Sequence, residues 1–133
     1  MGFEEDLKVG EKCEKCVKKL FESKGFQVDK NNCPTTYKEF DLYIGNVKKD
    51  DFYTIEIKAD FASMYTNNVA IEQKSLENSK ADYFIYIIPK VYMINTLRLR
   101  QLRENYKTVM GGDYNEPITL VPIKDFIKEC KKL

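Results

Sequence analysis

Apolar side chains recur every three or four residues near the start of the chain. They keep this helical spacing from residue 5 to residue 24, and Gly25 ends the run. The stripe consists of Val9, Cys13, Cys16, Val17, Leu20 and Phe21. The pattern therefore predicts an amphipathic helix over 5–24, followed by a short strand at 26–28.

Two alternating segments follow, at 39–45 and 52–59, and their polar positions carry charge. Successive side chains of a strand point to opposite faces, so each segment is expected to bury one apolar face. The predicted apolar faces are Phe40, Leu42 and Ile44 in the first strand, and Ile55 and Ile57 in the second. The polar segment between the strands begins with Gly45 and suits a hairpin turn. Such a hairpin would bring Asp41 and Glu56 side by side.

The rest of the chain alternates strands with short helices. Residues 83–88 are the most hydrophobic, and we expect a central strand there that Pro89 ends. A helix is predicted from 95 to 109, burying Leu99, Leu102, Tyr106 and Val109. The remaining expectations are an irregular segment at 60–68, a weak strand at 69–72, a loop at 75–79, a strand at 118–121 and a final helix that buries Ile123, Phe126, Ile127 and Cys130.

The length of 133 residues suits one domain, spanning residues 1–133. Apolar runs are too short to span a membrane and the first residues lack the order of a secretory signal, so the protein is expected to be soluble and cytoplasmic. The 22 Lys and Arg residues nearly balance the 21 Asp and Glu residues, giving a formal charge of +1. A nucleic-acid partner must therefore be held by a local patch.

Histidine is absent from the chain. Its absence excludes nucleophilic triads that rely on imidazole and removes the commonest zinc ligand. Cys13 and Cys16 have the spacing of a zinc or redox pair, but Cys33 and Cys130 do not form a second close pair. Because Cys13 and Cys16 lie on the apolar stripe, buried thiols are expected there, with a metal or redox role as the alternative. Hydrolytic chemistry must then use carboxylates, lysines, tyrosines or thiols.

Asp41, Glu56 and Lys58 are the candidate chemical groups of the hairpin. Glu56 and Lys58 share one strand face, and the hairpin adds Asp41 beside them. Two carboxylates and an ammonium on one surface suit metal-assisted phosphodiester cleavage. The alternative is a surface on which Glu56 and Lys58 form an incidental ion pair.

A helix, a strand, and a hairpin with Asp and then Glu-x-Lys together resemble the PD-(D/E)XK, or restriction-endonuclease-like, nuclease superfamily. Gly10-Glu11-Lys12-Cys13-Glu14 looks like the opening helix of archaeal-type Holliday-junction resolvases. Phe40-Asp41-Leu42 and Ile55-Glu56-Ile57-Lys58 look like their hairpin motif, with Phe40 where the written signature has Pro. The segments 66–72 and 79–83 are more similar to small phage-encoded nucleases of the superfamily.

The resemblance implies an α/β fold with an αβββαβ core, a mixed central sheet flanked by helices, and a bound Mg²⁺ or Mn²⁺ ion. Asp41 and Glu56 would bind the metal, with the Ile57 backbone carbonyl as a third ligand. Lys58 would stabilise the developing negative charge and help to deprotonate the nucleophile.

An acid on the opening helix joins the metal site in the resolvases that the chain resembles. Glu14 lies beside the apolar stripe whereas Glu11 points to solvent, so Glu14 is the candidate. An ion pair between Glu14 and Lys18 is the alternative. Glu72 is a candidate extra ligand, or else a solvated strand end.

Cationic and aromatic side chains are the candidates for contacting nucleic acid, although solvated surface positions are the alternative for all of them. The cations are Lys74, Lys80, Arg100, Arg103 and Lys107, and the rings for base stacking are Tyr37, Tyr43, Tyr53 and Tyr65.

The leading hypothesis is a Mg²⁺-dependent endonuclease that acts on DNA, including branched or recombination intermediates. An RNA endonuclease of the same fold, and a nucleic-acid-binding or assembly module without catalysis, are the alternatives. DNA is favoured over RNA as the partner, a homodimer is left open and no membrane partner is expected.

Overall fold

The computed structural model describes residues 3–35, 39–46, 51–111 and 115–133, with side chains from residue 8 on. The helices are α1 (Phe3–Ser23), α2 (Ser63–Thr66), α3 (Gln73–Asn78), α4 (Thr96–Arg103) and α5 (Ile123–Lys128). The strands are β1 (Gln27–Lys30), β2 (Leu42–Asn46), β3 (Asp51–Ala59), β4 (Asn68–Glu72), β5 (Tyr83–Ile87), β6 (Val91–Asn95), β7 (Thr108–Gly111), β8 (Glu116–Pro122) and β9 (Lys131–Lys132).

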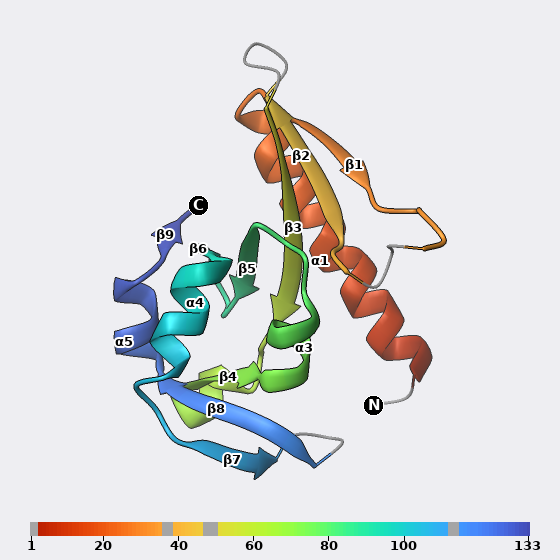
Figure 1. The fold of residues 1–133 in the computed structure, drawn as a ribbon. Helices are drawn as coiled ribbons and strands as arrows, with labels where there is room; N and C mark the ends of the chain where they lie inside the picture. The colour runs from red at the N-terminus through yellow and green to blue at the C-terminus, as the bar shows by residue number, and fades with distance from the viewer. Residues whose placement is uncertain (1–2, 36–38, 47–50, 112–114) are drawn as a thin grey trace.

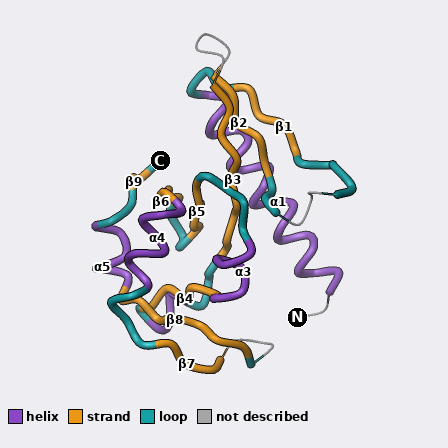
Figure 2. Tube along the Cα trace, viewed as in Figure 1, coloured by secondary structure: helices purple, strands orange, loops and turns teal. Residues whose placement is uncertain are grey.

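These elements form a mixed α/β fold with two sheets (Figures 1 and 2). The larger sheet has the order β1-β2-β3-β5-β6-β9, in which β3 and β5 are parallel and their other neighbours antiparallel. The smaller sheet has the order β4-β8-β7. Helix α1 lies against β1–β3, and α4 and α5 lie on the other side of the molecule (Figure 1). The prediction of a mixed sheet flanked by helices is confirmed.

The first helix confirms the predicted amphipathic segment. Cys13, Val17 and Phe21 are buried, and Gly25 follows the helix with φ +88°, a value that favours glycine. Cys16, however, is exposed, so the prediction of a buried thiol at this position is wrong. At 100° per residue Cys16 lies about 60° from Cys13 and further from Val17, which turns it off the buried stripe.

Strand β5 divides the apolar residues into two cores, as expected of a central strand. Ile85 and Ile87 point toward α1, where they pack with Leu42, Ile44 and Ile55. On the opposite face, Phe84 and Tyr86 pack with residues of the small sheet, α4 and α5. No helix in the described part of the chain is both long and apolar enough to cross a membrane.

Phe40 departs from the predicted alternation. It packs edge-to-face on Tyr43, with ring centroids 4.8 Å apart, in the core that faces away from Leu42 and Ile44. The prediction that Phe40 shares the face of Leu42 is wrong because β2 begins at Leu42 and the chain bends at Asp41. Strand alternation applies only within the paired segment.

Three further predictions need correction. Residues 63–66 of the expected irregular segment are helical, and so is most of the expected loop at 75–79. The predicted helix at 95–109 begins after Asn95, whose side chain accepts bonds from the Leu97 and Arg98 amides, and it ends at Arg103. Before this helix lies β6, paired with β5, and after it lies β7, paired with β8. Val109 belongs to β7 and is exposed rather than buried. Leu99 and Leu102 are buried as predicted.

Asp60 joins the two sheets where β3 ends. Its carboxylate accepts hydrogen bonds from the Ser63 amide (3.2 Å) and from the Ala70 amide of β4 (2.8 Å), and its own amide donates to the Ile87 carbonyl (3.2 Å). Bonds to a charged acceptor are stronger than neutral ones. The carboxylate therefore fixes α2 and β4 relative to the end of β3.

We expect Asp60→Ala to lower the free energy of unfolding by about 2–3 kcal/mol, because two partly buried amides lose a charged acceptor. Urea denaturation at neutral pH measures the loss. Asp29→Ala, an exposed carboxylate on β1, is the matched control and should change stability by less than about 0.5 kcal/mol. Equal, small effects of the two substitutions would show that Asp60 does not join the sheets.

Candidate active site

Asp41 lies at the point where β2 separates from β3. The β2–β3 ladder runs from Asn46↔Asp51 to Leu42↔Ile55, and beyond it the Ile57 amide donates to Asp41 Oδ2 at 2.7 Å. The Asp41 backbone is fixed as well, since its amide donates to the Ile55 carbonyl (2.8 Å) and its carbonyl accepts from the Asn31 amide (2.9 Å). The Asp41 carboxylate thus takes the place of a backbone acceptor on β2.

Glu56 and Lys58 follow on β3 and point to the face away from α1. Lys58 Nζ lies 3.7 Å from Glu56 Oε1 and 3.6 Å from Oε1 of Glu72, at the end of β4. The side chains of Glu56 and Lys58 are only 15% and 24% exposed. The structure therefore brings the predicted Glu56, Lys58 and Glu72 together, with Lys58 between two carboxylates.

The electrostatics of the site oppose the ionised form of its carboxylates. Burial, followed by the charge of Asp41, raises the pKa of Glu56 to about 7, although Lys58 acts in the opposite direction. Burial also raises the pKa of Asp41, against the effect of the hydrogen bond from Ile57. Two carboxylates that share a half-buried site cannot both ionise without cost. A cation bound between them would remove that cost.

Glu14 lies on α1, beside β1. It pairs with Lys30 of β1 at 3.4 Å, and not with the predicted alternative partner Lys18. After burial, the charge of Glu14 also contributes to the raised pKa of Asp41. Glu11, one turn earlier, is exposed. The Glu14 side chain is 25% exposed, in agreement with its predicted place beside the apolar stripe, and its part in the site stays a prediction.

Hard oxygen atoms at this site fit a divalent cation. In the described part of the chain, no three acidic or thiol side chains converge closely enough to hold a metal ion by themselves. The site instead pairs Asp41 and Glu56 near the backbone of Ile57, whose carbonyl points to the same strand edge as its amide. Two carboxylates, one carbonyl and water are a usual Mg²⁺ donor set. Glu14 and Glu72 have lysine partners, and their part in metal binding stays a prediction.

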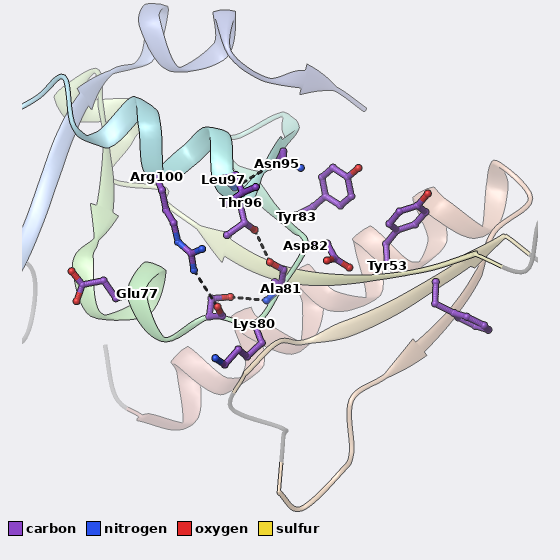
Figure 3. A pocket seen from close by; sticks show the side chains of 12 residues that line it. Tyr53, Glu77, Lys80, Ala81, Asp82, Tyr83, Asn95, Thr96, Leu97 and Arg100 are labelled. Atoms are coloured by element: carbon purple, nitrogen blue, oxygen red, sulfur yellow. Dashed lines mark hydrogen bonds between the residues drawn. The ribbon is translucent and has the colours of Figure 1, made fainter.

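The predicted cationic contacts divide into two groups. Lys74 lines a hollow of about 260 Å³ beside Glu56, and Lys80 lines a larger cavity next to it. Arg100 also lines that cavity (Figure 3), and it donates to the Leu76 and Ser79 carbonyls (3.1 and 3.3 Å). Arg103 pairs with Glu77 (3.7 Å), and Lys107 is exposed beyond α4. The two arginines therefore have structural partners, and a role for them in binding nucleic acid stays a prediction.

The candidate tyrosines are also separated in space. Tyr43 packs on Phe40, Tyr65 is 88% exposed on α2, and Tyr53 lines the larger cavity. Tyr37 lies outside the described residues. Among the candidate tyrosines that the structure describes, Tyr53 alone combines exposure with a place in a cavity, which borders the hollow beside Glu56.

Tyr86 is a neighbour of the site that the sequence pattern did not single out. It pairs with Lys58 in the β3–β5 register and is buried on the same face. Burial, and then the charges of Glu72 and Asp60, raise the pKa of Tyr86, so its hydroxyl remains protonated. Its position in a hydrophobic strand, two residues from Phe84, predicts a core residue, and the pairing with Lys58 depends on the β3–β5 register.

Comparisons by sequence identify no relative, since no family model and no curated protein matches the chain. Among solved structures, a nuclease from a fusselovirus matches with a TM-score of 0.54 and 20% sequence identity. The match covers 97% of this chain and 84% of that chain. The likeness therefore extends over both sheets and concerns the fold.

The raised pKa of Glu56 predicts that the metal-free protein loses stability as pH rises. Below about pH 4.5 the carboxyl is protonated in both the folded and unfolded states. Between that pH and about 7 only the unfolded state releases the proton, so the free energy of unfolding falls, by up to about 3 kcal/mol, and then levels off. Glu56→Gln should remove most of this fall and be more stable than wild type at pH 8.

Urea denaturation from pH 4.5 to 8 in the presence of a chelator measures both profiles. Glu11→Gln, which replaces an exposed glutamate of α1, is the control and should retain the wild-type profile. Parallel profiles for wild type and Glu56→Gln would mean that the Glu56 carboxylate is solvated in the folded protein.

Proposed function

We propose that this protein is a metal-dependent endonuclease of the restriction-endonuclease-like superfamily that hydrolyses phosphodiester bonds in nucleic acid. The observation that carries the proposal is the hydrogen bond from the Ile57 amide of β3 to the Asp41 carboxylate, which fixes this carboxylate beside Glu56. Lys58 follows Glu56 by two residues on the same face of β3. The fold is shared with a nuclease from a fusselovirus. DNA is the substrate we favour, and branched or recombination intermediates are the first structures to test.

Asp41, Glu56 and the Ile57 carbonyl would hold Mg²⁺ or Mn²⁺. Such an ion activates water and neutralises charge on a phosphate oxygen. The hydrogen bond from Ile57 fixes the orientation of the Asp41 carboxylate, and one of its oxygens then remains for a ligand. Among the described residues Glu56 pairs with Lys58 alone, so its second carboxylate oxygen is available to complete the pair.

Lys58 would act on the substrate itself. Its ammonium lies between Glu56 and Glu72, so both carboxylates restrain it on the site face of β3. From there it can donate to a phosphate oxygen as negative charge develops, and orient the attacking water. Tyr86, its register partner on β5, is buried on the same face and stays protonated.

Lys58→Ala should therefore reduce cleavage by about 10²-fold or more, as for the loss of a donor to a developing anion. Supercoiled plasmid, branched DNA and RNA, each with Mn²⁺, Mg²⁺ or EDTA, are the substrates for this assay. Wild type should cleave at least one of them only with metal. Absence of cleavage of all three by wild type, or wild-type turnover by Lys58→Ala, would contradict the proposed mechanism.

Glu14→Gln should lower the cleavage rate more than Glu11→Gln, since Glu14 acts electrostatically on Asp41 whereas Glu11 is exposed. The two substitutions remove the same charge from the same helix, so the comparison isolates position. Initial rates at saturating metal provide the measurement. Equal rates would exclude a contribution of the helix acid to the site.

A further inference from the structure

A cavity of about 520 Å³ opens at the edge of β3, where this strand extends beyond the start of β5 (Figure 3). The two strands pair only from Ile55↔Tyr83 on, and before that point the Asp82 carboxylate accepts from the Thr54 amide at 2.9 Å. Residues 52 and 53 therefore face the cavity instead of a neighbouring strand on this side. The volume lies in the range of small-ligand sites, roughly 300–1,000 Å³.

Aromatic rings form one wall of this cavity. Tyr53 and Tyr83 contact edge-to-face, with centroids 5.7 Å apart and planes at 72°, and their rings stand side by side in Figure 3. Tyr53 is 38% exposed. Phe52, which is 67% exposed, also lines the cavity, but its side chain leaves the opposite face of β3 and its ring lies over Gly45 of β2. Exposed aromatic faces in a hollow suit a flat, unsaturated ligand.

The polar groups of the cavity suit a neutral ligand rather than a phosphate. Two cations, Lys80 and Arg100, are matched by two carboxylates, Glu77 and Asp82, so the lining has no net formal charge. Asn95 uses its side-chain oxygen to cap α4, and its amide nitrogen makes no hydrogen bond with the described residues. Aromatic faces with hydrogen-bonding groups at their rim match a nucleobase.

The cavity connects with the candidate active site. Ser79 lines both this cavity and the hollow beside Glu56, which also contains Lys74. Tyr53 precedes Glu56 by three residues, about 10 Å along an extended strand, and their side chains leave opposite faces of β3. The path from Glu56 to the Tyr53 ring therefore runs round the open edge of the strand, past Ser79. Lys74 and Lys80 lie at successive points of this path, and Lys80 makes no ion pair with the described residues. Arg100 fixes the wall between the two hollows by its bonds to Leu76 and Ser79.

We propose that this cavity binds an unpaired nucleobase of the strand that leaves the active site, with its backbone passing Lys74 and Lys80. The substrate class is therefore nucleic acid with a single-stranded or splayed segment next to the scissile bond, rather than uninterrupted duplex. A paired base cannot enter a cavity at the edge of a sheet without leaving its stack. This inference rests on the proposed function and adds its substrate class.

Fluorescence anisotropy with a labelled single-stranded oligonucleotide, and with a duplex of the same sequence, tests the inference in the presence of a chelator. Phe52→Ala and Tyr53→Leu should weaken single-strand binding by about tenfold, as for loss of one base–aromatic contact, and duplex binding much less. Phe61→Ala, which removes a 43% exposed ring beyond the other end of β3, is the matched control and should bind as wild type does. Circular dichroism melting confirms that each variant is folded.

A series of oligonucleotides with one abasic position each adds a second readout. Wild type should lose affinity at one position of the series, and Tyr53→Leu should lose no more when that base is absent. Unchanged single-strand affinity in both variants, while metal-dependent cleavage persists, overturns this inference and leaves the proposed function standing. A change of oligomeric state in Phe52→Ala without a change in affinity also overturns it. A wild-type protein that neither binds single strands nor cleaves any nucleic acid overturns both.

Discussion

The hydrogen bond from the Ile57 amide to the Asp41 carboxylate is the interaction on which the candidate site depends. It forms where β2 stops providing carbonyls to β3, past the Leu42↔Ile55 pair. A buried amide without an acceptor would destabilise the sheet by about 1–3 kcal/mol, so an acceptor is needed there whatever the function. Because a side chain supplies it, the same bond that completes the sheet fixes a carboxylate beside Glu56.

This arrangement has an electrostatic consequence. The Asp41 charge and burial together raise the pKa of Glu56, and Lys58 offsets only part of the effect while it also pairs with Glu72. The site is therefore least stable when both acids are ionised and no cation is bound. Such strain is typical of sites whose charges are arranged for a ligand. The Asp60 bonds to α2 and β4 hold Glu72 at the end of its strand and so keep the second partner of Lys58 in place.

The sequence allowed prediction of the elements whose periodicity is set by one packed face: α1, the β2–β3 hairpin and β5. It also allowed prediction of the proximity of Asp41, Glu56 and Lys58, because strand alternation and a short turn determine it. The β7 strand could not be predicted, because its pairing with β8 outweighs the local helical pattern at 95–109. The β6 strand lies before that pattern and is fixed by its pairing with β5. Likewise, the cavity at Tyr53 depends on where β5 begins relative to β3, which no single segment encodes.

Calorimetric titration of the protein with Mn²⁺ at pH 8 tests most directly whether Asp41 and Glu56 form a metal site. We expect one ion to bind wild type, binding to be lost in Asp41→Asn and in Glu56→Gln, and binding to persist in Lys58→Ala because the ammonium is not a ligand. Retained binding in both carboxylate variants, or no binding to wild type at millimolar Mn²⁺, would contradict a metal-dependent site at this hairpin.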